Sequence, residues 1–193
     1  ESFGTAIAPN VGDIIASTSY HDGYIRFSTP ETFAEGNAVI AAMNANGVIL
    51  WSWHIWCASE GWKEQVYYNN AGTMMDRNLG ATSAKPGDVG SLGLFYQWGR
   101  KDPFLGAGSV SGESRAASTG SWTISSDSMT PVIAEQNPMT FYMYNFNYLP
   151  DWCWDSNKTA YDPCPAGWRV PDGGEKGIWV TASGNAKDFK VSG

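Results

Sequence analysis

Two carboxylates beside tryptophans are the residues of this chain that come closest to a catalytic pair. Asp151 and Asp155 flank Trp152 and Trp154. Two carboxylates next to an aromatic groove are the arrangement with which glycoside hydrolases cleave sugar chains. The remaining acidic residues are scattered and no other pair stands out, so we expect a protein that is not an enzyme. Glycoside hydrolysis stays as an alternative.

Histidine and cysteine add no clear catalytic or metal site. The chain has two histidines, His21 and His54, and no pair of Cys or His at ligand spacing, so the sequence predicts no zinc site and no cofactor. No Gly-x-Ser-x-Gly motif supports a serine hydrolase, and we interpret His54 as half-buried among tryptophans and hydrogen-bonded to a neighbour. Cys153 and Cys164 flank a polar loop, which favours a disulfide bond over two buried thiols. Cys57 is left over, and a buried thiol is favoured over a nucleophile.

Aromatic residues are the main compositional signal. Ten Trp, nine Tyr and eight Phe occur in 193 residues. Flat rings beside Asn, Asp and Ser suit stacking on carbohydrate, although such rings also fill the core of loop-rich domains. The Ser-rich segment 106–137 is expected to be the most mobile part of the chain. The candidate ligand-binding residues are aromatic and lie in or after it: Trp122, Tyr142, Tyr144, Tyr148, Trp152 and Trp154.

Charge and composition exclude several classes of protein. The net charge is −7 with only 12 Lys and Arg, so no basic stripe is present to bind nucleic acid or an anionic membrane. No apolar run reaches the roughly 18 residues that cross a bilayer. With 22 Gly, 10 Pro and 16% charged residues, the composition favours a β-rich, secreted or outer-surface domain.

The predicted elements give a β-rich α+β protein in two parts. Asn44-Ala-Asn-Gly47 lies between two apolar runs, which is a strong hairpin signal. We therefore predict an N-terminal antiparallel β-segment over residues 1–57 and a loop-rich domain over residues 58–193. A short helix is predicted over 178–183. Internal ion pairs are predicted among neighbouring cations and carboxylates, which are Asp76, Arg77, Arg100, Lys101 and Asp102.

Three motifs resemble a known family. Met75-Asp-Arg-Asn-Leu-Gly-Ala, Gly93-Leu-Phe-Tyr-Gln-Trp-Gly-Arg and Asp162-Pro-Cys-Pro-Ala-Gly-Trp-Arg-Val-Pro resemble the Fibrobacter succinogenes major paralogous domain (FISUMP) and the fimbrillin-like surface proteins of gut Bacteroidetes. That family is similar to C-type-lectin-like folds. The resemblance implies a β-segment that ends in a Trp-rich strand, followed by a partial C-type-lectin-like domain. It also implies that the chain is a fragment, incomplete at its C-terminus.

The resemblance also implies a function. We expect a binding module of an adhesin or fimbria-associated lipoprotein, which contacts glycans, surface proteins or fimbrial subunits through aromatic-rich loops. The alternative is a stalk or assembly domain whose open-ended β-segment pairs with another chain. The calcium motifs of C-type lectins are absent, so no calcium ligand is carried over. Asp127-Ser-Met resembles the O-glycosylation site of exported Bacteroidetes proteins, which makes Ser128 a glycosylation candidate.

Overall fold

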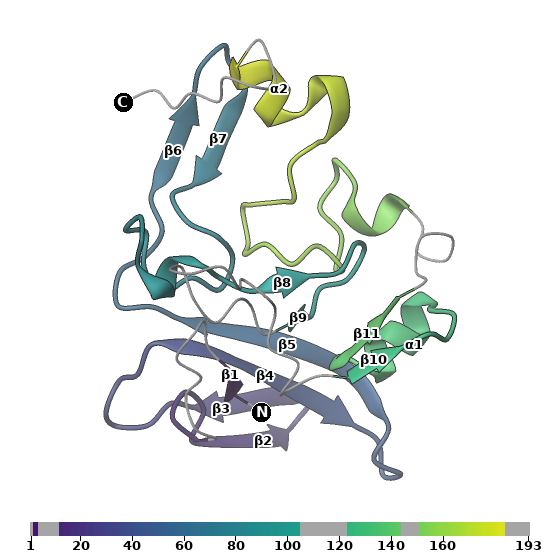
Figure 1. Ribbon diagram of the computed structural model, residues 1–193. Coiled ribbons are helices and arrows are strands. Elements are labelled where there is room, and N and C mark those ends of the chain that lie inside the picture. The colour runs from purple at the N-terminus through teal and green to yellow at the C-terminus, as the bar shows by residue number, and fades with distance from the viewer. Residues whose placement is uncertain (1, 4–11, 105–122, 144–150, 184–193) are drawn as a thin grey trace.

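Short strands dominate the computed structural model, which describes residues 2–3, 12–104, 123–143 and 151–183 (Figure 1). This confirms the predicted β-rich class. The strands are β1 (Ser2–Phe3), β2 (Ser17–His21), β3 (Tyr24–Ser28), β4 (Gly36–Met43), β5 (Ile49–Cys57), β6 (Glu64–Tyr67), β7 (Gly72–Met75), β8 (Phe95–Tyr96), β9 (Pro103–Phe104), β10 (Thr123–Ser125) and β11 (Thr140–Tyr142). The α-helices are α1 (Pro131–Gln136) and α2 (Ile178–Ser183), and the 3-10 helices are η1 (Val89–Ser91), η2 (Asp151–Trp154) and η3 (Gly174–Lys176). No helix among the described residues is long and apolar enough to cross a membrane.

The β4–β5 hairpin is the longest element, and it forms where the Asn-Gly signal predicts it. Its turn is closed by hydrogen bonds of 3.0 Å from the Asn44 N–H to the Val48 carbonyl and from the Gly47 N–H to the Asn44 carbonyl. Gly47 has a φ of +76°, a conformation that glycine adopts without steric cost. β1 pairs antiparallel with the other edge of β4, so the order of the described strands is β1-β4-β5, with β5 at one edge.

Each of the other sheets contains two of the described strands. β2–β3, β6–β7 and β8–β9 pair antiparallel, whereas β10–β11 pair parallel. All described strands within the N-terminal segment therefore pair antiparallel, as predicted. Part of the segment expected to be mobile is instead regular, because it forms β10 and α1. In Figure 1 the β4–β5 hairpin crosses one end of the molecule, and β6–β7 with α2 lies at the other end.

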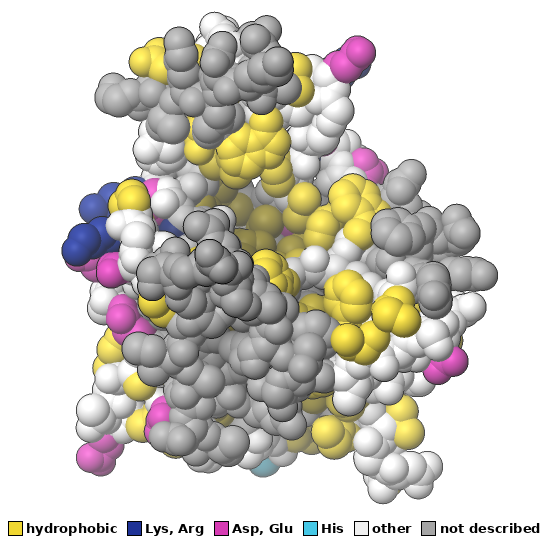
Figure 2. Space-filling model, in the orientation of Figure 1, with side chains coloured by type: hydrophobic (Ala, Val, Ile, Leu, Met, Phe, Trp, Pro, Cys, Tyr) yellow, Lys and Arg dark blue, Asp and Glu magenta, His cyan; other side chains and the backbone are white. Residues whose placement is uncertain are grey.

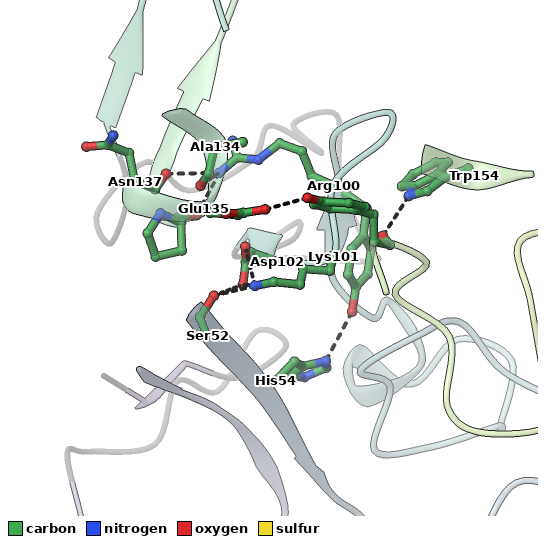
Figure 3. Close-up of polar contacts among 12 residues, drawn as sticks. Ser52, His54, Arg100, Lys101, Asp102, Ala134, Glu135, Asn137 and Trp154 are labelled. Atoms are coloured by element: carbon green, nitrogen blue, oxygen red, sulfur yellow. Dashed lines mark hydrogen bonds and ion pairs between the residues drawn. The ribbon is translucent and has the colours of Figure 1, made fainter. Parts of the chain in front are cut away.

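Arg100 joins the loop after β8 to α1 and β11 through hydrogen bonds. Its side chain is buried, and its guanidinium donates hydrogen bonds to the carbonyls of Ala134, Asn137 and Thr140 at 3.3, 2.9 and 2.5 Å. These carbonyls lie at the end of α1 and at the start of β11, where a helix leaves its last carbonyls unpaired. Arg100 thus fixes α1 and β11 on the loop that follows β8 (Figure 3).

The predicted ion pairs form in two of three cases. Arg77 Nε lies 2.9 Å from Asp76 Oδ1, and Lys101 Nζ lies 2.9 Å from Asp102 Oδ1. Arg100 departs from the prediction, because the partners of its guanidinium are backbone carbonyls and the Gln97 side chain. The chain therefore uses this cation to satisfy backbone groups that a charge pattern does not reveal.

Candidate functional site: a tryptophan-lined cleft

A cleft of about 480 Å³ lies between β5 and the loop 160–165, a volume typical of small-molecule sites. The loop 160–165 belongs to the proline-rich motif, more than a hundred residues after β5 in the sequence. Aromatic rings line much of the cleft, from Trp51, Trp53, Trp56, Trp62 and Tyr96. The polar groups in its wall belong to Ser52, His54, Lys101, Asp162 and Cys164. We refer to these lining residues as the tryptophan cleft.

Two of the tryptophan rings are stacked on each other and held in place within the protein. The rings of Trp56 and Trp62 stack with centroids 5.2 Å apart and planes 26° from parallel. The Trp56 indole N–H donates a 3.0 Å hydrogen bond to the Ala81 carbonyl, which fixes its orientation. Trp53 and Trp62 are each 39% exposed, so part of each ring faces solvent. The cleft therefore presents aromatic surface that needs little ordering on binding.

His54 lies in the cleft wall as a neutral residue in a hydrogen-bonded chain. The Asn37 amide nitrogen donates to the Gly80 carbonyl at 2.8 Å, so the Asn37 oxygen faces His54. His54 Nε2 donates to that oxygen at 2.8 Å, and Nδ1 accepts from the Tyr96 hydroxyl at 3.3 Å. Burial lowers the pKa of His54 to about 4, although the Asp102 carboxylate acts in the opposite direction. This confirms the hydrogen-bonded histidine predicted from the sequence.

Ser52, Lys101 and Asp102 form a compact polar cluster, of which Ser52 and Lys101 line the cleft (Figure 3). Ser52 Oγ donates to Asp102 Oδ1 at 2.5 Å, and Lys101 Nζ donates to both carboxylate oxygens at 2.9 and 3.0 Å. Lys101 Nζ also donates to Ser52 Oγ at 2.5 Å and lies 4.5 Å from the centre of the Trp51 ring. Burial lowers the pKa of Lys101, and Asp102 opposes that shift.

This cluster is better suited to anchoring β5 than to nucleophilic catalysis. A Ser–Lys pair reacts when the lysine is free to accept the serine proton. Here the ammonium is held by a carboxylate, and the Ser52 proton points to the same carboxylate. Ser52 is also only 1% exposed. The three side chains therefore fix the middle of β5 to the loop that carries Lys101 and Asp102.

One buried carboxylate holds the proline-rich loop in its shape. The Asp162 carboxylate accepts hydrogen bonds from the N–H groups of Cys164 and Val170, both at 2.8 Å, and from Lys158 Nζ at 3.0 Å. Its side chain is fully buried. Prolines in this stretch remove backbone donors, so the few N–H groups that remain must find partners elsewhere. Asp162 supplies the acceptors for two of these N–H groups and thereby positions the cleft wall.

Of the residues predicted to bind ligand, the two whose side chains the structure describes, Tyr142 and Trp154, do not line the tryptophan cleft. Tyr142 is 4% exposed and packs in a small core, so its ring is not a surface platform. Trp154 is half-buried; its indole N–H donates to the Tyr161 carbonyl at 3.0 Å, and its ring lies 5.0 Å from that of Trp98. Trp122, Tyr144 and Tyr148 lie outside the described residues, as does the side chain of Trp152.

Trp154 contributes to a second cavity of about 490 Å³, which shares Leu79, Tyr96, Pro163 and Cys164 with the tryptophan cleft. Its other walls come from β7, the segment 167–172 and the start of α2. On the face drawn in Figure 2, hydrophobic side chains gather around a hollow. Asp155, half of the carboxylate pair considered for hydrolysis, is exposed and accepts a hydrogen bond from the Ser156 N–H at 2.6 Å. The side chain of Asp151 lies outside the described residues.

The predicted disulfide bond is not present. Cys153 and Cys164 are free thiols in this structure, and Cys57 is a half-buried free thiol. The Cys164 side chain is instead engaged with the Asp162 carboxylate, and burial, reinforced by that carboxylate, raises the pKa of Cys164 to about 12. A thiol held this way is a poor nucleophile. Ser128, the glycosylation candidate, is exposed in the turn between β10 and α1.

The tryptophans of β5 could have been found from the sequence, but their partner wall could not. Trp51, Trp53 and Trp56 lie in the strand that the hairpin signal predicts. Their association with residues 160–165 is a long-range contact without a local signal. No protein-family model, curated protein or solved structure with which the chain was compared matches it. The functional argument therefore depends on the geometry of the cleft and on the motifs.

Proposed function

We propose that this chain is a non-enzymatic, glycan-binding module of a secreted or outer-surface protein. The tryptophan cleft is the observation that carries the proposal. The module would be FISUMP-like and would contain a partial C-type-lectin-like domain. It would form part of an adhesin or fimbria-associated protein. The three sequence motifs and the charge-poor, glycine-rich composition support that context.

A sugar ring is the ligand whose chemistry best fits the cleft. One face of a pyranose carries C–H groups that pack on an indole ring, and its edges carry hydroxyls that need polar partners or water. The exposed faces of Trp53 and Trp62 offer the first kind of contact. Because the Trp56 ring is already held by the Ala81 carbonyl, little side-chain entropy is lost on binding.

The engagement of the polar groups favours binding over catalysis. Ser52, Lys101 and Asp102 bond to one another, and His54 uses both ring nitrogens on protein partners. A general acid or base must reach a substrate atom with a group that is free to exchange its proton. The described lining residues therefore include no pair poised for acid–base catalysis, and this supports the proposal of a binding site.

The test is a glycan-binding screen of the full chain, comparing the wild type with Trp62→Ala and Trp179→Ala. We expect specific binding to one glycan class, lost in Trp62→Ala because the stacked pair in the cleft is removed. Trp179 is a matched control, since it is 47% exposed but lies on α2 beside Tyr67, outside the cleft. Absence of binding by folded wild type, or equal loss in both variants, would contradict the proposal.

A structural stalk that adds strands from another subunit is the second candidate function. The β2–β3 hairpin favours it, because nine of its ten residues are exposed, including Tyr20 at 74% and Tyr24 at 69%. An isolated two-stranded hairpin is marginally stable in water, and an open edge can accept a further strand. A concentration series by light scattering tests this candidate: self-association that Tyr20→Lys abolishes supports it, and a persistent monomer argues against it.

A further inference from the structure

The charges around the tryptophan cleft define which glycans it can take. Resting on the glycan-binding function proposed above, we infer that the cleft selects an uncharged sugar and discriminates against acidic ones such as uronic or sialic acids. The inference follows from how each ionisable group in the cleft wall is already paired.

The cationic group of the cleft is neutralised by its neighbour. Among the described lining residues, Lys101 is the only Lys or Arg. Its ammonium contacts both oxygens of Asp102 and the Ser52 hydroxyl, and its side chain is 10% exposed. A carboxylate on a ligand would have to compete with Asp102 for this ammonium, at the cost of a buried pair.

The acidic group of the cleft is neutralised in the same way. Asp162 is the only Asp or Glu among the described lining residues. Its carboxylate binds the Lys158 ammonium and two backbone N–H groups. With Lys101 and Asp162 each matched by an opposite charge, the cleft has no net charge to offer a ligand.

The remaining polar side chains are neutral and occupied. Both ring nitrogens of His54 are bonded within the protein, and the Cys164 thiol faces Asp162. The exposed aromatic rings are then the main attraction, and because the face of an indole ring is electrostatically negative, these rings offer nothing to an anion. An acidic sugar would lose hydration without gaining a cation and would approach a chain of net charge −7.

The test uses two oligosaccharides that differ only in one carboxylate, such as a glycan with a uronic acid and the same glycan with that carboxyl reduced to a primary alcohol, titrated against the full chain. We expect the neutral form to bind with an affinity that changes by less than about twofold between about 50 and 500 mM NaCl, because no ion pair is screened. We expect the acidic form to bind at least about tenfold more weakly at low salt, where charge effects are largest. Tighter binding of the acidic form, weakened by salt, would overturn the inference while leaving glycan binding intact.

A gain-of-function variant provides an independent test of the selection against acidic sugars. Ala160 lines the cleft and is exposed, so Ala160→Lys places a free ammonium at its edge. We expect this variant to gain affinity for the acidic glycan, in a salt-dependent manner, while still binding the neutral one. Ala166→Lys is the matched control, since Ala166 is exposed on the same loop but lines neither cavity. Equal gains in both variants would overturn the inference, and failure of wild type to bind either glycan would overturn the proposed function itself.

Discussion

Replacing Asp162 with alanine should destabilise the protein strongly, because one buried carboxylate satisfies three donors. The substitution leaves the N–H groups of Cys164 and Val170 without acceptors and the Lys158 ammonium without its counter-charge. A buried donor left unsatisfied costs about 1–3 kcal/mol, and breaking a buried ion pair about 3–5 kcal/mol. Because these terms overlap and Lys158 can turn to solvent, we expect the free energy of unfolding to fall by about 3–5 kcal/mol.

The assay is urea unfolding followed by tryptophan fluorescence, with the slope of the transition used to check that unfolding stays cooperative. Asp162→Asn is the second variant, in case the alanine variant does not fold. Asparagine keeps one acceptor oxygen but turns an amide donor toward the other N–H group, so we expect a smaller loss of about 2–3 kcal/mol.

Asp172→Ala is the matched control, because Asp172 belongs to the same proline-rich segment and also forms an ion pair. It lies 2.7 Å from Arg169, but its side chain is 52% exposed. Surface pairs of this kind contribute little to stability, so the control should resemble the wild type. If Asp162→Ala lost less than about 1 kcal/mol, or no more than the control, the hydrogen bonds of Asp162 would not be what holds the loop.

Three further predictions follow from buried or paired groups. Burial holds the pKa of His54 at about 4, below its ordinary 6.5, so the unfolded chain binds a proton between these pH values that the folded chain refuses. The free energy of unfolding should therefore fall as the pH drops from 6.5 to about 4, by on the order of 3 kcal/mol, and urea titrations should show a flatter pH profile for His54→Gln. Without reductant, the denatured chain should yield three reactive thiols; one would mean that the bridge forms. Arg100→Lys should cost about 2–4 kcal/mol in urea unfolding, since lysine lacks the fork that reaches several carbonyls, whereas Arg169→Lys should cost less because the Asp172 partner of half-buried Arg169 is exposed.

Local features of the fold could be predicted from the sequence. The turn of the β4–β5 hairpin is specified by Asn44 and Gly47, and the short helix over 178–183 forms as predicted. The pairs Asp76–Arg77 and Lys101–Asp102 join adjacent residues. Each of these features depends on residues a few positions apart, where side-chain chemistry alone restricts the backbone.

Long-range features could not be predicted, because their partners carry no shared local signal. β10 and β11 pair in parallel only because α1 carries the chain back between them, and Arg100 then bonds the end of that helix. The sequence showed this region as Ser-rich and polar, which is typical of mobile loops. The predicted disulfide was wrong for a similar reason: nearness of Cys153 and Cys164 in the sequence did not reveal that Asp162 engages Cys164.

Strand β5 contributes both polar and aromatic side chains to the tryptophan cleft. Ser52 and His54 tie β5 to Asp102 and Tyr96, which both lie outside the hairpin, and this holds a strand that pairs only with β4 among the described strands. Hydrogen bonds have strict geometry, whereas packing between flat rings tolerates sliding. A strand anchored by hydrogen bonds can therefore expose part of the Trp53 ring to solvent without losing its position. The buried polar groups therefore hold the aromatic surface of the cleft in place.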